Sequence, residues 1–235
     1  MNRLLVFLFA FSGCTSAHDG GQTTAQKPGV VYLDKRLKDI IDPASKVEII
    51  GTGYTWSEGP VWLPEHKMLL FSDVPENRIY KWIENEGVTL FLQPSGYTGS
   101  SKREGENGSN GLGLDMDGAL LLCQHGDRRV ARYVGSLENP EPEFQTVVDN
   151  YQGKRFNSPN DLALDSQGNI YFTDPPYGLP VNSDSDEIKE LDFQGVFRLN
   201  SDGTLDLLEK NISRPNGVAL SPDNKTLYVA NSDPD

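Results

Sequence analysis

The feature that most constrains this chain is a motif that recurs four times at an interval of about fifty residues. Each unit has a polar residue, a short apolar run, an Asp, Asn or Gly turn, and a second apolar run. The units start at Glu58, Asn110, Asn160 and Asn216, which are 52, 50 and 56 residues apart. Since Asn, Asp and Gly tolerate the positive φ angles of tight hairpins, each unit predicts a pair of antiparallel strands.

The interval between the units selects the fold class. Third strands are expected in three of the units, over residues 78–82, 130–133 and 196–199. Several short strands repeated about every fifty residues are typical of β-propeller blades, whereas a β-sandwich would not repeat one anchor residue at this interval. We therefore predict an all-β propeller domain over residues 30–235. Within this domain, a short helix over 34–41 and a strand over 46–50 are expected before the first repeat.

The number of units leads to a second expectation. Only 19 residues follow Asn216, which is enough for two strands of a fourth blade. Propellers close on themselves with about four to eight blades. We therefore expect this sequence to hold about three and a half blades, the N-terminal part of a truncated propeller domain.

The N-terminus predicts export. An apolar run over residues 4–11 follows Arg3; it is too short to cross a bilayer but has the length of a signal-peptide core. Small residues before Cys14 resemble a bacterial lipoprotein cleavage box. We expect residues 1–13 to be a signal peptide, Cys14 to be lipidated and residues 14–29 to be a flexible tether. An ordinary secretory signal is the alternative. The protein would then be periplasmic or on the outer surface, and held to a membrane only through its lipid anchor.

Charge and cysteine content narrow the remaining classes. The net charge of −13 repels phosphate backbones, which argues against nucleic-acid binding. No feature indicates a protein partner. With only two cysteines, one of them Cys14, a disulfide framework is excluded. Cys123 ends the apolar run over 119–123 and is expected to be a buried strand thiol.

The residues that start the four units are the candidates for chemistry. The first strand of a propeller blade begins beside the central channel, so Glu58, Asn110, Asn160 and Asn216 are expected to face a common centre. One carboxylate and several amide oxygens suit a hard cation such as Ca²⁺ or Mg²⁺ better than a thiol-seeking metal. The pattern therefore predicts a cation site in the channel.

Four segments, read in order, resemble the gluconolactonase branch of the senescence-marker-protein (regucalcin) family. They are Ser57-Glu58-Gly59-Pro60-Val61-Trp62, Arg155-Phe156-Asn157-Ser158-Pro159-Asn160-Asp161, Thr173-Asp174-Pro175-Pro176-Tyr177-Gly178 and Arg214-Pro215-Asn216-Gly217-Val218. The resemblance covers about Gly51 to the end of the chain. It implies a six-bladed propeller with one catalytic divalent cation, most suitably Ca²⁺, with Mg²⁺ and Zn²⁺ as alternatives.

The resemblance also implies residue roles. Glu58 and Asn216 match metal ligands of the family, and Asn160 matches a residue that binds the metal or contacts the substrate through it; the implied metal set is therefore Glu58, Asn160 and Asn216. The last ligand, an Asp that also serves as general base, is expected in a Pro-Asp-Gly motif beyond Asp235. The implied reaction is hydrolytic opening of a sugar lactone to an aldonic acid, with the cation polarising the lactone carbonyl.

Three further side chains are candidate substrate contacts, and each has an alternative interpretation. Asn110 lies at a strand start. His125 follows a strand whose loop could reach the channel mouth, or is a surface histidine. Arg155 matches a family substrate contact, or is a solvated loop charge. Asp174 is expected to cap the Pro175-Pro176 turn. Two alternative functions remain: a propeller hydrolase acting on other lactones or phosphotriesters, and a non-catalytic propeller that binds a ligand.

Overall fold

The computed structural model describes residues 30–233 and divides the chain into two units, Met1–Thr52 and Gly53–Asp235. In the described part of the first unit, a 3-10 helix η1 (Lys35–Asp39) begins after Asp34, whose carboxylate accepts the N–H of Arg36 at 2.8 Å. The predicted helix over 34–41 is thus a short 3-10 helix. Cys14, the signal peptide and the tether lie outside the described residues.

The predicted strand over 46–50 is wrong. This segment pairs with no strand among residues 30–233, and Ile49 is 70% exposed. Apolar alternation favours a strand only where a neighbouring strand accepts its backbone hydrogen bonds. Among the described residues, no helix has the length and apolarity needed to cross a bilayer.

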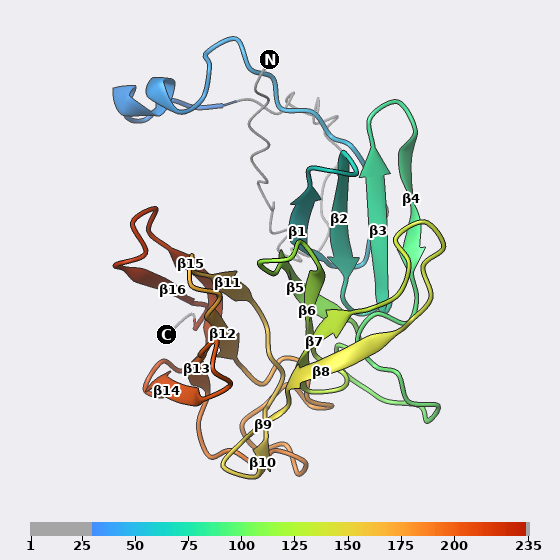
Figure 1. The fold of residues 1–235 in the computed structure, drawn as a ribbon, viewed down its shortest axis with the longest axis vertical. Coiled ribbons are helices and arrows are strands. Elements are labelled where there is room, and N and C mark those ends of the chain that lie inside the picture. The colour runs from blue at the N-terminus through green and yellow to red at the C-terminus, as the bar shows by residue number, and fades with distance from the viewer. Residues whose placement is uncertain (1–29, 234–235) are drawn as a thin grey trace, which may run out of the picture. The chain divides into compact units, whose positions relative to one another are not determined.

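The second unit consists of successive antiparallel sheets, one for each sequence repeat (Figure 1). Three sheets have four strands in sequential order, the fourth repeat forms a hairpin, and a small extra hairpin precedes the third sheet. The strands are β1 (Ser57–Leu63), β2 (Met68–Asp73), β3 (Arg78–Ile83), β4 (Gly87–Leu92), β5 (Ser109–Leu114), β6 (Leu120–Gln124), β7 (Arg129–Tyr133), β8 (Phe144–Val148), β9 (Asn150–Tyr151), β10 (Lys154–Arg155), β11 (Leu162–Leu164), β12 (Ile170–Asp174), β13 (Gly195–Leu199), β14 (Leu205–Glu209), β15 (Pro215–Leu220) and β16 (Leu227–Asn231).

This arrangement confirms the all-β prediction and the three predicted third strands, which are β3, β7 and β13. Sequential four-stranded antiparallel sheets are the blades of a propeller. The described chain holds three such blades and the β15–β16 hairpin of a fourth, as the repeat count predicted. The fourth strand of each complete blade, β4, β8 or β14, was not predicted.

The blades pack face to face through their apolar side chains. All five residues of β6 are buried, and alternate side chains point to opposite neighbours. Leu120 and Leu122 join a cluster with the first sheet, while Leu121 and Cys123 join a cluster with Phe172 and other side chains of the third sheet. This explains the continuous apolar run of the second repeat. Full burial of a Leu or Phe side chain contributes about 1.5–3 kcal/mol.

The first strands of the blades are neighbours. β5 contacts β1 and β11, and β11 contacts β15, so the strands that carry the repeated anchor residues lie next to one another (Figure 1). The second unit therefore brings together the beginnings of its repeats, which are about fifty residues apart in sequence.

Candidate active site

Hydrogen bonds to the main-chain carbonyls of Asn110, Asn160 and Asn216 connect the beginnings of successive repeats. The buried Ser72 hydroxyl donates to the carbonyl of Asn110 at 2.9 Å. The N–H of Gly111 donates to the carbonyl of Asn160 at 2.7 Å. The Thr173 hydroxyl donates to the carbonyl of Asn216 at 2.6 Å. The anchor residues are therefore held by the blades themselves rather than by mobile loops.

Glu58, in β1, is half-buried and sits in an acidic environment. The indole N–H of Trp56 donates to its carboxylate at 3.2 Å. Burial raises the pKa of the Glu58 carboxyl, the Trp56 N–H opposes this rise, and the nearby carboxylates of Asp161 and Glu106 raise the pKa further. A cation beside Glu58 would offset both the burial and the repulsion from these carboxylates.

Asn160, just before β11, has a buried amide with an unusual pattern of contacts. The residue is 2% exposed, and its nitrogen Nδ2 lies 3.3 Å from Nε2 of His125. Its oxygen Oδ1 is buried and has no hydrogen-bond partner in the part of the chain that the structure describes. Because a buried acceptor without a partner costs about 1–3 kcal/mol, Oδ1 is suited to take a ligand. A cation would supply that partner.

Asn216, in β15, is half-buried. Its amide nitrogen donates to the Ser232 hydroxyl at 2.9 Å, so the amide oxygen is the end that remains to bind a ligand. Tyr177 bonds the same Ser232 hydroxyl, while burial raises the pKa of the Tyr177 phenol. Tyr177 is a further candidate site residue, which no repeat position predicted although it lies in the motif from Thr173 to Gly178.

The available ligands have the chemistry of a hard-cation site. Among residues 30–233, no three His, Cys, Asp or Glu side chains come together in a group that could hold a metal ion. A cation in this part of the protein would therefore have at most two such side chains as ligands, and amide or main-chain oxygens would have to complete its coordination. The set predicted from the sequence, Glu58, Asn160 and Asn216, offers oxygen atoms of the kind that suits Ca²⁺.

The predicted substrate contacts occupy three different environments. Asn110 is buried at the start of β5. His125 is completely buried, so the surface-histidine alternative is wrong. Arg155 is exposed, and its guanidinium donates to the carbonyl of Asp127 at 2.7 Å. For all three residues, substrate contact stays a prediction.

Asp174, the last residue of β12, supports the segment that carries Asn160. Its carboxylate accepts the N–H of Asn157 at 2.8 Å and of Ser158 at 2.7 Å. The prediction that it caps the Pro175-Pro176 turn is wrong, because these bonds run to the segment before β11. Asp174 is fully buried, and burial raises its pKa to about 7 although both N–H groups oppose the rise.

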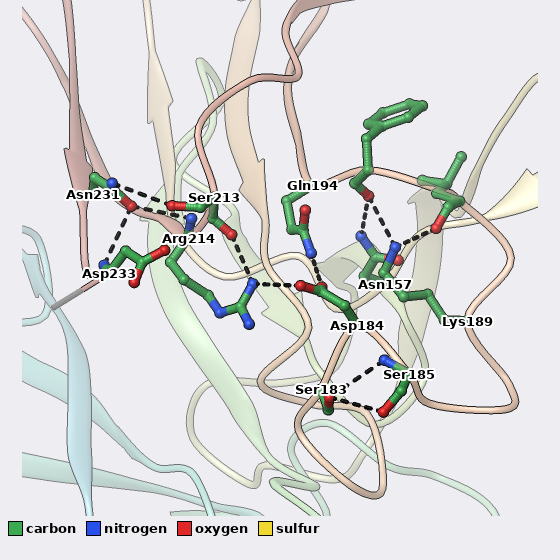
Figure 2. Close-up of polar contacts among 12 residues, drawn as sticks. Asn157, Ser183, Asp184, Ser185, Lys189, Gln194, Ser213, Arg214, Asn231 and Asp233 are labelled. Atoms are coloured by element: carbon green, nitrogen blue, oxygen red, sulfur yellow. Dashed lines mark hydrogen bonds and ion pairs between the residues drawn. The ribbon is translucent and has the colours of Figure 1, made fainter. Parts of the chain in front are cut away.

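The long segment between β12 and β13 braces two of the predicted metal-binding strands (Figure 2). On one side, the amide of Asn157 donates to the carbonyl of Phe193 at 2.9 Å. On the other, the guanidinium of Arg214 donates to the carboxylate of Asp184 at 3.0 Å and to the carbonyl of Ser213 at 2.8 Å. The segments before Asn160 and Asn216 therefore share one support.

A sequence model described as SMP-30/Gluconolactonase/LRE-like region matches residues 56–235, which include every repeat of the chain. The chain belongs to the SMP-30/gluconolactonase family. Its resemblance to that family, based on the motifs around Glu58, Asn160, Asp174 and Asn216, is confirmed.

Comparisons with individual proteins agree with this family assignment. The gluconolactonase of Zymomonas mobilis is 48% identical over 206 residues, which cover 87% of this chain and 56% of the relative. A gluconolactonase structure from Xanthomonas campestris is 34% identical with a TM-score of 0.65, covering 78% of this chain and 57% of that one. Regucalcin from Agrobacterium tumefaciens, a calcium-binding protein, shares the fold at 15% identity and a TM-score of 0.54, covering 77% and 52%.

The chain spans about half the length of the curated relatives it matches: 56% of the Zymomonas gluconolactonase, 47% of an Aspergillus oryzae lactonohydrolase and 53% of a Haloferax volcanii pentonolactonase.

Proposed function

We propose that the whole protein is a divalent-cation-dependent hydrolase that opens sugar lactones of the gluconolactone type to aldonic acids. The observation that carries this proposal is the buried oxygen of Asn160, which has no hydrogen-bond partner among residues 30–233. Asn160 lies just before β11, and β5 contacts both β11 and β1, the strand that carries the half-buried Glu58. Support also comes from the 48% identity to a gluconolactonase.

In this proposal, Glu58 supplies the negative charge of the site, and Asn160 and Asn216 supply neutral oxygens. A bound cation, Ca²⁺ in the first instance, would polarise the lactone carbonyl and stabilise the developing oxyanion. Asn110 and Arg155 would orient the sugar hydroxyls. The base that activates water is proposed to be an Asp beyond Asp235, as the family resemblance implies.

The proposal is tested on the whole gene product by assaying gluconolactone hydrolysis with and without a chelator. Glu58→Ala is expected to lower both Ca²⁺ affinity and kcat/KM by at least about 100-fold, because the charged ligand is lost. Glu65→Ala, in the exposed turn after β1, is the matched control and should retain both. Activity that survives both the chelator and Glu58→Ala would overturn the metal assignment.

The same assay separates the alternative functions. Hydrolysis of aryl or acyl lactones or of phosphotriesters, but not of sugar lactones, would change the substrate class. Ca²⁺ binding at Glu58 with no hydrolysis of any of these compounds would favour a non-catalytic binding propeller.

We also propose that the protein is exported and anchored through a lipidated Cys14, on the basis of the N-terminal sequence. Expression with labelled palmitate should label the wild-type protein and leave Cys14→Ser unlabelled. An unlabelled wild-type protein in the periplasmic fraction would instead indicate an ordinary secretory signal.

A further inference from the structure

His125 is a fully buried polar residue beside Asn160, one of the predicted metal ligands. It follows β6, its backbone N–H donates to the carbonyl of Gly108 at 3.1 Å, and its side chain is 0% exposed. Gly178 lies against it so closely that a Cβ there would be 2.5 Å from the Cβ of His125. The imidazole therefore has little freedom to rotate.

The two ring nitrogens of His125 face two different side chains. Nε2 lies 3.3 Å from the amide nitrogen of Asn160, and Nδ1 lies 3.2 Å from Oε2 of Glu106. The approach to Glu106 has the distance of an ion pair without the direction of a hydrogen bond, and Nδ1 has no hydrogen-bond partner within residues 30–233. Since a buried ring N–H needs an acceptor, the Glu106 carboxylate is the group placed to serve as one.

The order of donors and acceptors follows from these contacts. A neutral imidazole has one N–H donor and one acceptor nitrogen. The amide nitrogen of Asn160 can only donate, so Nε2 must accept. The ring proton is then on Nδ1, facing the carboxylate of Glu106. Glu106 therefore fixes the tautomer of His125. His125 in turn fixes which end of the Asn160 amide points toward the imidazole ring.

We propose that Glu106 and His125 are positioning residues that hold the Asn160 amide with its oxygen toward the cation. This inference rests on the proposed function, since it presumes that Asn160 is a metal ligand. The terminal torsion of an asparagine side chain has two broad minima, so its oxygen and nitrogen can exchange places. An amide that turned its NH₂ group toward a cation would repel it. Partners of this kind behind a metal ligand are commonly worth 10- to 100-fold in metal affinity.

The distinctive consequence concerns Asn160→Asp. A carboxylate has two equivalent oxygens, so it presents an oxygen to the cation in either orientation. His125 should therefore matter when residue 160 is Asn and should matter little when it is Asp. A merely structural histidine would matter equally in both backgrounds, because the packing around it is the same.

The experiment measures Ca²⁺ affinity by titration calorimetry on the whole gene product and three variants: His125→Leu, Asn160→Asp and the double variant. We expect His125→Leu to weaken binding about 10- to 100-fold in the wild-type background and less than about 3-fold in the Asn160→Asp background. Equal losses in the two backgrounds would overturn the proposal. Because each background has its own reference, a general loss of stability cancels.

Two more variants guard against a folding defect. In His125→Gln, the side-chain oxygen can still accept from the Asn160 amide, so this variant should bind Ca²⁺ more tightly than His125→Leu. Glu106→Leu should weaken binding, whereas Glu104→Leu should not, because the Glu104 side chain is 72% exposed and forms an ion pair with the exposed Lys102. A larger loss of Ca²⁺ affinity in Glu104→Leu than in Glu106→Leu would contradict the positioning role of Glu106 and His125.

A direct test of the tautomer uses ¹⁵N-edited spectra of the imidazole rings, which are tractable because the chain has three histidines. The proton of His125 should be on Nδ1, and a proton on Nε2 would overturn the inference. Failure of the underlying function is recognised separately. If Glu58→Ala binds Ca²⁺ as tightly as the wild type, the assignment of the metal site is wrong. If Glu58→Ala loses affinity but the His125 variants do not, only the positioning role of Glu106 and His125 is wrong.

Discussion

The carboxylate of Asp161 accepts the backbone N–H of Val218 at 2.9 Å, a contact between residues 57 positions apart. Its other oxygen accepts the N–H of Leu162 at 2.9 Å. Burial raises the pKa of Asp161, and the two backbone N–H groups oppose the rise. This side chain therefore joins the first strand of the third blade to the β15–β16 hairpin.

Replacement of this carboxylate should destabilise the fold. Asp161→Ala leaves the N–H of Val218 without its acceptor, which is expected to cost about 1–3 kcal/mol in the free energy of unfolding. Asp117→Ala is the matched control: its side chain is 79% exposed and pairs with Arg132, so a change within about 0.5 kcal/mol is expected. Urea unfolding of the whole protein measures both. Equal effects would contradict the assigned role of Asp161.

Asp174 should make stability depend on pH. Its native pKa is about 7, raised by burial, while in an unfolded chain it is about 4. Below about pH 4 the group is protonated in both states. Between about pH 4 and pH 7 the unfolded state releases the proton first, so the free energy of unfolding falls as pH rises, by at most about 1.4 kcal/mol per pH unit. Above about pH 7 the contribution is flat.

The measurement compares urea unfolding of the wild type and Asp174→Asn from pH 4.5 to pH 8. Charged Arg128 and Lys189, which lower the pKa of Asp174, remain in both proteins. Their difference in stability should therefore change across this window and level off above about pH 7. A constant difference would show that Asp174 is ionised throughout.

The thiol of Cys123 should resist alkylation in the folded protein. It is fully buried, and desolvation, with smaller effects from Asp161 and Asp174, raises the pKa of its thiol well above the usual value. Because the thiolate is the reactive form, alkylation of the native protein should be at least about 100-fold slower than in denaturant. Peptide mapping distinguishes Cys123 from Cys14. Rapid native labelling at Cys123 would show that the blade opens.

Much of the blade architecture could be predicted because its signals are local. The run over 119–123 predicts β6 from five adjacent residues, and a turn residue such as Gly118 is next to it in sequence. The outer strands have weaker signals. β8 has no buried residue, so no continuous apolar run marks it. The segment 46–50 shows the converse, since it has an apolar pattern and no pairing partner within the described chain.

Within the candidate site, the residues that start each repeat could be predicted from the sequence, whereas residues in the connecting segments are harder to predict. Glu58, Asn110, Asn160 and Asn216 occupy equivalent positions in their repeats, so periodicity selected these four residues, and the family resemblance then singled out Glu58, Asn160 and Asn216 as metal ligands. Glu106 and Tyr177 lie in connecting segments whose lengths differ between repeats, and no spacing rule identifies them. His125 lies against Gly178, which comes from the next repeat and reaches it only in the folded chain.

Gly59 should be sensitive to a single methyl group. It adopts a positive φ of 55°, and a Cβ there would lie 2.0 Å from the backbone carbonyl oxygen of Asn110. Gly203 is a natural control, because it also has a positive φ, 87°, but a Cβ there would meet no atom within 4 Å. Gly203→Ala should therefore cost only the conformational strain, about 1 kcal/mol.

Gly59→Ala must add a displacement of β1 from β5 to the same strain, so its loss of stability should exceed that of Gly203→Ala by at least about 1 kcal/mol. Because Glu58 precedes Gly59, this displacement should also weaken Ca²⁺ binding, whereas Gly203→Ala should leave the Ca²⁺ affinity unchanged. Urea unfolding and calorimetric titration of the two variants measure these effects. Equal stabilities of the two variants would show that the backbones at Gly59 and Asn110 are not held in contact.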